Sequence, residues 1–300
     1  MTIDDLQLAL ENAQAASQHL ALPLAGKNWS GPAGEFAGSG TGSSIDFHDQ
    51  RDYHPGDDPR HINWQAYARN GSYTMKLYRE EVRPLVELIV DVTPSMFLTK
   101  QKAMRSCEMI YLLHALAEKS GSAVQIYLLH GDHHLRVERD QLASHAWFEK
   151  VANFSSKQKK TAEADGPSLP RVDHLPLRAK SFRLILTDGL YLGDPTSWLH
   201  QLARGQGVMS LFIPYCSEEE NPAWRGNCNL KDTEQGRDHQ VHINPKQLDA
   251  YKTAYNNHFS LWQQCAQKFQ APLARIPAEL SLIESLQLQA LPKQALSTNS

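Results

Sequence analysis

Residues 85–96 read LVELIVDVTPSM, and residues 182–189 read FRLILTDG. Each stretch is a short apolar run that stops at a carboxylate, Asp91 in the first and Asp188 in the second. Continuous apolar runs of this length are typical of strands that are buried on both faces, as in a parallel α/β sheet. The two stretches therefore predict an α/β fold with a largely parallel sheet and helices on both of its faces.

Oxygen donors follow both predicted strands. Because ligand sites in such sheets gather at the carboxyl ends of strands, we expect four side chains to lie together there. These are Asp91, Thr93, Ser95 and Asp188. All four offer hard oxygen ligands, which is the set that a Mg²⁺-like ion prefers. The stretch predicts a site for Mg²⁺ or Mn²⁺, and the alternative is that the two Asp side chains only cap helices or close turns.

The order Asp-x-Thr-x-Ser after one strand and Thr-Asp-Gly after a later one resembles the metal-ion-dependent adhesion site of von Willebrand factor A domains. The resemblance implies that hydroxyls bind the ion directly, that carboxylates act partly through water, and that an acidic side chain of a partner completes the coordination. It also implies a further Thr from a loop between the two stretches. Thr161 is the candidate for that role, although Lys157, Lys159 and Lys160 around it argue against it.

A second motif lies just before the first strand, where residues 51–69 read RDYHPGDDPRHINWQAYAR. This segment is similar to the hallmark of a bacterial family known only as a domain of unknown function, number fifty-eight. The matching positions are Arg51, Tyr53, Pro55, Gly56, Asp57, Asp58, Arg60, Ile62, Trp64, Ala68 and Arg69. The resemblance covers about residues 35–290. It implies a von Willebrand A-like domain that this signature segment precedes.

The signature segment also has a physical interpretation. Its His-Pro-Gly-Asp run at 54–57 predicts a type II turn, and the Asp-Pro pair at 58–59 predicts a short helix that ends at Gly71. We expect arginines to clamp the acidic side chains in a buried unit, with Trp64 packed beneath it. The alternative is a docking surface for a partner.

Composition excludes several classes of protein. With 300 residues, 41% hydrophobic and 21% charged, the chain has the profile of a globular protein with a sizeable core. A formal charge of −3 and the lack of a basic stripe argue against nucleic-acid binding. No apolar run is long enough for a membrane span, and the N-terminus does not resemble a signal peptide. The four cysteines have no metal-binding spacing, which favours reduced thiols and a cytoplasmic location.

The chain is predicted to divide into four parts. An N-terminal helix with a Thr2–Asp5 capping box occupies 1–30, and the signature segment with its Gly/Ser-rich loop, acidic turn and strand occupies 31–84. The von Willebrand A-like domain occupies 85–290, and 291–300 form a frayed tail. Further strands are expected at 72–78, 123–130, 134–138, 208–214 and 272–276. Further helices are expected at 102–119, 144–154, 194–205, 245–270 and 279–290, with a long polar connection at 155–178.

The sequence assembles no nucleophile, base and oxyanion set, so we expect a protein that is not an enzyme. Family members that resemble it are usually encoded beside a MoxR-type AAA+ ATPase. The resemblance implies an adaptor or co-chaperone that couples this ATPase to the assembly, maturation or stress handling of an unidentified client. Two alternatives stay open. One is a structural scaffold with a vestigial metal site, and the other is a metal-dependent hydrolase that uses His48, Asp49, Asp52, His54, Asp57, Asp58 and His61.

Overall fold

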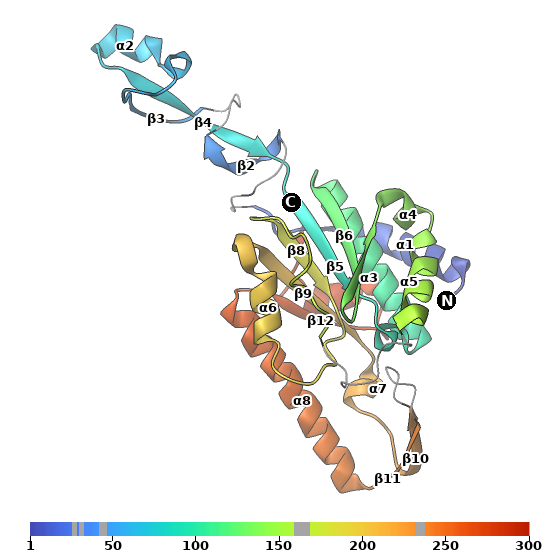
Figure 1. Cartoon of the computed structure of the whole chain (residues 1–300). Helices are drawn as coiled ribbons and strands as arrows, with labels where there is room; N and C mark the ends of the chain where they lie inside the picture. The colour runs from blue at the N-terminus through green and yellow to red at the C-terminus, as the bar shows by residue number, and fades with distance from the viewer. Residues whose placement is uncertain (26–28, 30–32, 42–46, 159–168, 232–237, 300) are drawn as a thin grey trace.

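A six-stranded sheet forms the centre of the protein. The computed structural model describes residues 1–25, 29, 33–41, 47–158, 169–231 and 238–299. The strand order is β12-β9-β8-β5-β6-β7, with β7 antiparallel at one edge and the other strands parallel (Figure 1). The strands are β5 (Leu85–Asp91), β6 (Ala123–His130), β7 (His133–Val137), β8 (Phe182–Leu186), β9 (Val208–Tyr215) and β12 (Leu273–Pro277). The predicted α/β fold class with a largely parallel sheet is confirmed.

Helices cover both faces of this sheet (Figure 1). One face packs against α1 (Ile3–Ser17), α3 (Lys100–Lys119), α4 (Arg139–Ala143), α5 (Ala146–Gln158) and α9 (Leu282–Gln289). The other face packs against α6 (Thr196–Leu202) and α8 (Pro245–Lys268). In β5, Leu88 and Val90 lie in the first core, whereas Ile89 between them lies in the second. Because successive side chains of a strand point to opposite faces, a strand covered on both sides needs the continuous apolar run seen in the sequence.

Side-chain caps fix where the main helices begin. Thr2 and Asp5 form the predicted capping box of α1, and Asn244 forms another with Gln247 at the start of α8. Thr99 Oγ1 accepts a hydrogen bond from the backbone N–H of Lys102, at 3.1 Å, at the start of α3. Each cap satisfies a backbone donor that has no partner inside the helix. The first turn of α3 is thereby held at the end of the sheet where β5 terminates.

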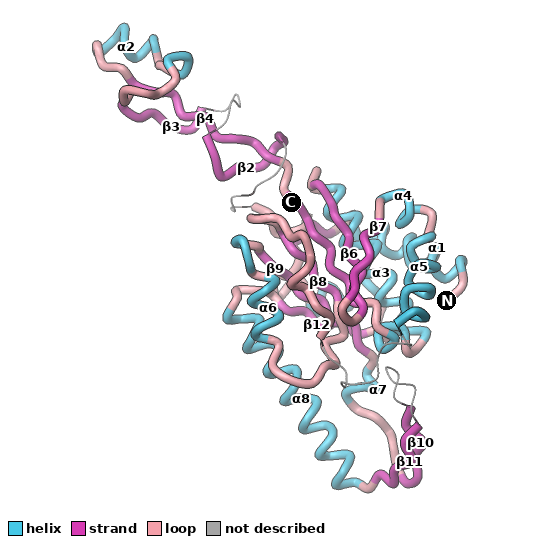
Figure 2. The backbone as a smooth tube through the Cα atoms, in the orientation of Figure 1, coloured by secondary structure: helices cyan, strands magenta, loops and turns pink. Residues whose placement is uncertain are grey.

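The signature segment forms an arm that projects from the main body (Figures 1 and 2). Its antiparallel sheet has the order β2-β4-β3, and it carries a 3₁₀ turn and a short helix. The elements are β2 (Ala33–Thr41), β3 (Phe47–Asp52), η1 (Pro59–His61), α2 (Trp64–Asn70) and β4 (Thr74–Val82). The prediction of a loop through the Gly/Ser-rich run was wrong for 33–41, because β2 pairs with β4 through its backbone and this pairing needs no apolar alternation.

The C-terminal tail does not fray over its described residues, 291–299, which corrects the prediction of a frayed tail at 291–300. Strand β13 (Ser297–Thr298) pairs with β1 (Leu20–Ala21), and Ala295 and Leu296 are buried. Apolar side chains at these two positions give the tail a place in the core beside α1 and α9. Backbone pairing thus joins the C-terminal tail to the segment that follows α1.

Several short elements were not predicted from the sequence. Ser144 caps the end of α4 and does not begin the following helix, which starts at Ala146. Beyond β9 lie α7 (Ser217–Glu220) and a hairpin of β10 (Gly226–Lys231) and β11 (Asp238–Ile243). The hairpin projects near the first turns of α8 (Figure 2). Among the helices that the structure describes, none combines the length and the apolar character that crossing a membrane requires.

Candidate functional site

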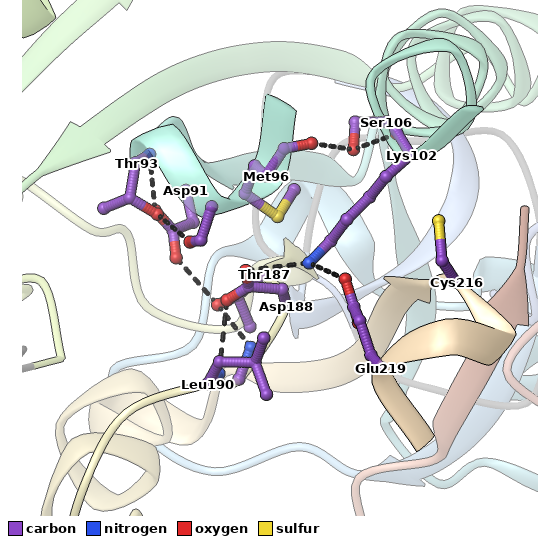
Figure 3. A network of polar contacts seen from close by, with 12 residues as sticks. Asp91, Thr93, Met96, Lys102, Ser106, Thr187, Asp188, Leu190, Cys216 and Glu219 are labelled. Atoms are coloured by element: carbon purple, nitrogen blue, oxygen red, sulfur yellow. Dashed lines mark hydrogen bonds and ion pairs between the residues drawn. The ribbon is translucent and has the colours of Figure 1, made fainter. Parts of the chain in front are cut away.

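The four predicted metal ligands lie at or just beyond the carboxyl ends of two neighbouring strands of the central sheet, and Figure 3 shows Asp91, Thr93 and Asp188 among them. Strands β5 and β8 are parallel neighbours, with Val90 opposite Leu186, so that Asp91 at the end of β5 and Asp188 just after β8 lie at the same edge of the sheet. Thr93 and Ser95 lie in the turn after β5, and their hydroxyl oxygens are 3.1 Å apart. Thr161, the candidate for a further ligand, lies outside the described residues.

Asp91 is buried and surrounded by neutral donors. Its Oδ1 accepts a hydrogen bond from the backbone N–H of Thr93 at 3.0 Å, and its Oδ2 accepts from the Thr187 hydroxyl at 2.8 Å. The Tyr191 hydroxyl donates to the same Oδ2. Burial, together with the negative charge of Asp188, raises the pKa of Asp91 to about 6, although the hydrogen bonds oppose this shift.

Lys102 reaches into the site from the first turn of α3 (Figure 3). Its Nζ donates to Asp188 Oδ2 at 3.1 Å and to Glu219 Oε1 of α7 at 2.7 Å. The side chains of Lys102 and Asp188 are 0% and 1% exposed, and that of Glu219 is 15% exposed. Burial disfavours the ammonium, but the two carboxylates outweigh it, so the pKa of Lys102 is raised. Sequence reasoning missed this residue because a lysine in a helix usually lies in solvent.

The donor set is only partly suited to a divalent ion. The hydroxyls of Thr93 and Ser95 are close enough for both to approach one small cation. The carboxylates are less suitable, because Asp91 already accepts three hydrogen bonds and the Lys102 ammonium lies against Asp188. Across the described ranges, no group of three His, Cys, Asp or Glu side chains is arranged to hold a metal ion. The cation that the structure places beside Asp188 is the ammonium group of Lys102.

The charged residues of the signature segment form local, exposed pairs. The Arg51 guanidinium donates two hydrogen bonds to the Asp57 carboxylate, of 2.8 and 2.6 Å. Arg60 Nη2 lies 2.6 Å from Asp58 Oδ2. The Arg60 side chain is 85% exposed, and Arg69 is also exposed. The prediction of a buried clamp was therefore wrong. The reason is that each Arg reaches a carboxylate within six positions of itself, which needs no core around it.

The turn of this segment has the predicted form. The backbone N–H of Asp57 donates to the His54 carbonyl at 3.0 Å, and Gly56 has a φ of 108°. A positive φ at the third position of a turn is the requirement of type II that glycine meets. Asp58 caps η1, and Gly71 ends α2 in the left-handed conformation, as predicted for the two ends; the single predicted helix is divided into these two elements, because Asn63 caps α2 separately.

An aromatic cluster lies on the surface of the arm. It consists of Tyr53, Trp64, Tyr67 and Tyr73, in which the rings of Tyr67 and Tyr73 stack at 4.5 Å and Trp64 meets both edge-on. Trp64 is 57% exposed, Tyr73 is 47% exposed and Tyr67 is 37% exposed. The prediction that Trp64 packs beneath the turn was wrong, because its ring instead lies edge-on against Tyr67 and Tyr73 at the surface.

The acidic loop gives no support to the hydrolase alternative. Asp57 is paired with Arg51 and Asp58 with Arg60, and these arginines lower the pKa of both carboxyls. Among the described side chains of the loop, no group of three His, Cys, Asp or Glu residues is arranged to hold a metal ion.

Two of the solved structures that match this chain illustrate how weak the likeness is. A conserved hypothetical protein BatB from Bacteroides thetaiotaomicron is 10% identical with a TM-score of 0.30, over 61% of this chain and 99% of that chain. An aerotolerance-related membrane protein from Bacteroides fragilis NCTC 9343 is 10% identical with a TM-score of 0.28, over 62% of this chain and 98% of that chain. Because both TM-scores are below 0.5, neither likeness supports a conclusion about this protein.

Sequence comparison is more decisive. No curated protein matches the chain significantly. A family model does match, over residues 49–260, which include the motif at 51–69, β5, β8 and most of α8. Since this match covers well over half of the chain, the protein belongs to the family described as "Protein of unknown function DUF58".

Proposed function

We propose that this protein is a non-catalytic adaptor or co-chaperone that binds a MoxR-type AAA+ ATPase in the cytoplasm. In this role it couples the ATPase to the assembly, maturation or stress handling of a client protein. The partner class comes from the family resemblance carried by the signature segment, residues 51–69, within a chain that belongs to the DUF58 family. The same resemblance underlies the expectation of a von Willebrand A-like domain.

The exposed aromatic cluster of the arm is the observation that carries this proposal. Trp64, Tyr67 and Tyr73 present stacked and edge-on rings to solvent. Trp and Tyr dominate the binding energy of many protein interfaces, because they offer a large contact area at a small cost in side-chain entropy. Their mutual packing already restricts the rings, so less freedom is lost on binding. The arm also holds this surface away from the main body (Figure 2).

A binding measurement between the purified chain and a MoxR-type ATPase from the same organism tests the proposal. We expect Trp64→Ala to weaken the complex by about 2 kcal/mol, roughly 30-fold in Kd, as for a hot-spot residue. The melting temperature should stay unchanged, since Trp64 is more than half exposed. Leu192→Ala is the matched control, because Leu192 is 81% exposed on the main body and should not affect binding.

Two results would contradict the proposal in different ways. If the wild-type chain does not bind the ATPase, the adaptor role is wrong. If it binds and Trp64→Ala binds equally well, the role stands but the docking surface lies elsewhere. The network of Lys102, Asp188 and Glu219 favours a second candidate, a structural scaffold with a vestigial metal site, and the first of these results would select it.

A further inference from the structure

The ammonium group of Lys102 occupies the place of a cation in the site. Its side chain is 0% exposed, and its Nζ lies 3.1 Å from Asp188 and 2.7 Å from Glu219. Lysine is almost never fully buried unless it is paired. We propose that this ammonium is the built-in cation of the site, so that Asp188 and Glu219 are held without a divalent ion.

The contacts of Asp188 leave little room for a second cation. Its Oδ1 accepts a hydrogen bond from the backbone N–H of Leu190 at 3.2 Å, and its Oδ2 accepts from Lys102. A divalent ion bound to this carboxylate would lie close to the ammonium, and like charges repel strongly at short range in a buried site. To admit the ion, Lys102 would have to give up one of its two carboxylate partners while it stayed buried.

Asp91 is consistent with this arrangement. It is 2% exposed, and three neutral donors satisfy its oxygens. Neutral donors can stabilise a carboxylate without a metal ion, much as backbone N–H groups do at the start of a helix. The positive charge of the site, the Lys102 ammonium, thus lies beside Asp188, whereas the Asp91 carboxylate is stabilised by hydrogen bonds.

The ammonium also joins three elements that are far apart in the sequence. Lys102 belongs to α3, Asp188 follows β8, and Glu219 belongs to α7. The backbone carbonyl of Glu219 also accepts a hydrogen bond from the Tyr251 hydroxyl of α8 at 2.6 Å. Glu219 therefore takes the position beside the cation that an acidic side chain of another protein would need. The site is closed to the partner carboxylate that the adhesion-site resemblance implies. This inference does not depend on docking at the arm.

A titration of the full wild-type chain with Mn²⁺, followed by calorimetry and by the paramagnetic relaxation of water, tests the inference. We expect no binding up to about 1 mM, the weak end of the range for cation sites in proteins. The NMR signal of the Lys102 ammonium should show slow exchange with water and should not move when Mg²⁺ is added. Saturable Mn²⁺ binding that Asp188→Asn abolishes would overturn the inference.

A charge-removing variant adds an independent test. Lys102→Met keeps the length of the side chain but leaves Asp188 and Glu219 without a cation, so we expect a lower melting temperature that Mn²⁺ partly restores. Lys100→Met is the matched control, since Lys100 lies two positions before Lys102 on the same helix. Its side chain is 74% exposed and pairs with Asp5 at 2.9 Å. A Lys102→Met protein that melts like the wild type without added ion would overturn the inference. If this variant does not fold, the wild-type titration still decides.

Discussion

A buried ion pair in the central sheet gives the sharpest test of how this fold is held together. Glu87 of β5 lies opposite Arg183 of β8, and the two side chains are 0% and 1% exposed. Arg183 Nε donates to Glu87 Oε2 at 3.1 Å, while Ser181 and the backbone N–H of Arg178 also donate to this carboxylate, at 2.7 and 2.8 Å. Both charges are thus paired and hydrogen-bonded in the interior.

Removal of the guanidinium should be costly. Arg183→Met leaves Glu87 as a buried charge without a cation, which costs about 3–5 kcal/mol. The guanidinium also donates to the carbonyls of Arg178 and Arg204, at 2.7 and 2.8 Å, and these acceptors would lose a partner. At roughly 2 °C per kcal/mol for a chain of this size, the melting temperature should fall by about 6–10 °C.

Urea unfolding at neutral pH measures this change, and a second substitution checks its cause. Adding Glu87→Gln to Arg183→Met removes the uncompensated charge and should restore part of the lost free energy of unfolding. Arg60→Ala is the control, because the pair of Arg60 and Asp58 is exposed and such pairs contribute little to stability. The reasoning is refuted if Arg183→Met costs less than about 1 kcal/mol, or if Arg60→Ala costs as much as Arg183→Met.

Two further predictions concern Asp91 and the C-terminal tail. The pKa of Asp91 is raised from 3.8 to about 6 in the folded state, so the folded protein holds an extra proton between these values. The stability that this carboxyl contributes is therefore fully present below pH 3.8 and is lost as the pH rises through 6. Urea unfolding midpoints measured between about pH 4 and 7 should show this fall. The substitution Asp91→Asn should flatten the pH dependence. Leu296→Ala should lower the free energy of unfolding by about 2–4 kcal/mol, because Leu296 is 1% exposed. Unchanged urea unfolding of Leu296→Ala would mean that the tail frays in solution.

Much of the central sheet could be predicted because its strands carry a strong local signal. The runs at 85–91 and 182–186 are apolar on both faces, and their carboxyl ends could be placed together from the parallel topology alone. The long helix α8 was also predictable, since Asn244 and Pro245 are typical of a helix start. Glu87 and Arg183 interrupt these runs, and a sequence does not reveal that they are cross-strand partners.

Other features depend on contacts that leave no local pattern. Lys102 is buried because Glu219 comes to it from 117 positions further along the chain, and no spacing in the sequence predicts that meeting. The hairpin of β10 and β11 lacks an alternating apolar pattern, since the described side chains of β11 are almost all exposed. Trp64 was expected in a core because tryptophan is highly buried on average, whereas it is 57% exposed and packs edge-on against Tyr67 and Tyr73.

The closed site and the open arm bear on the same question, which is where a partner obtains its binding energy. At the end of the sheet, Lys102 already binds two carboxylates, so a partner's acidic group would have to displace Glu219 before it gained a contact. At the arm, the rings of Trp64 and Tyr73 already lie in solvent, so a partner can bury them without breaking any contact of that kind. Because binding free energy is what remains after such costs, the arm is the surface that we propose for a protein partner.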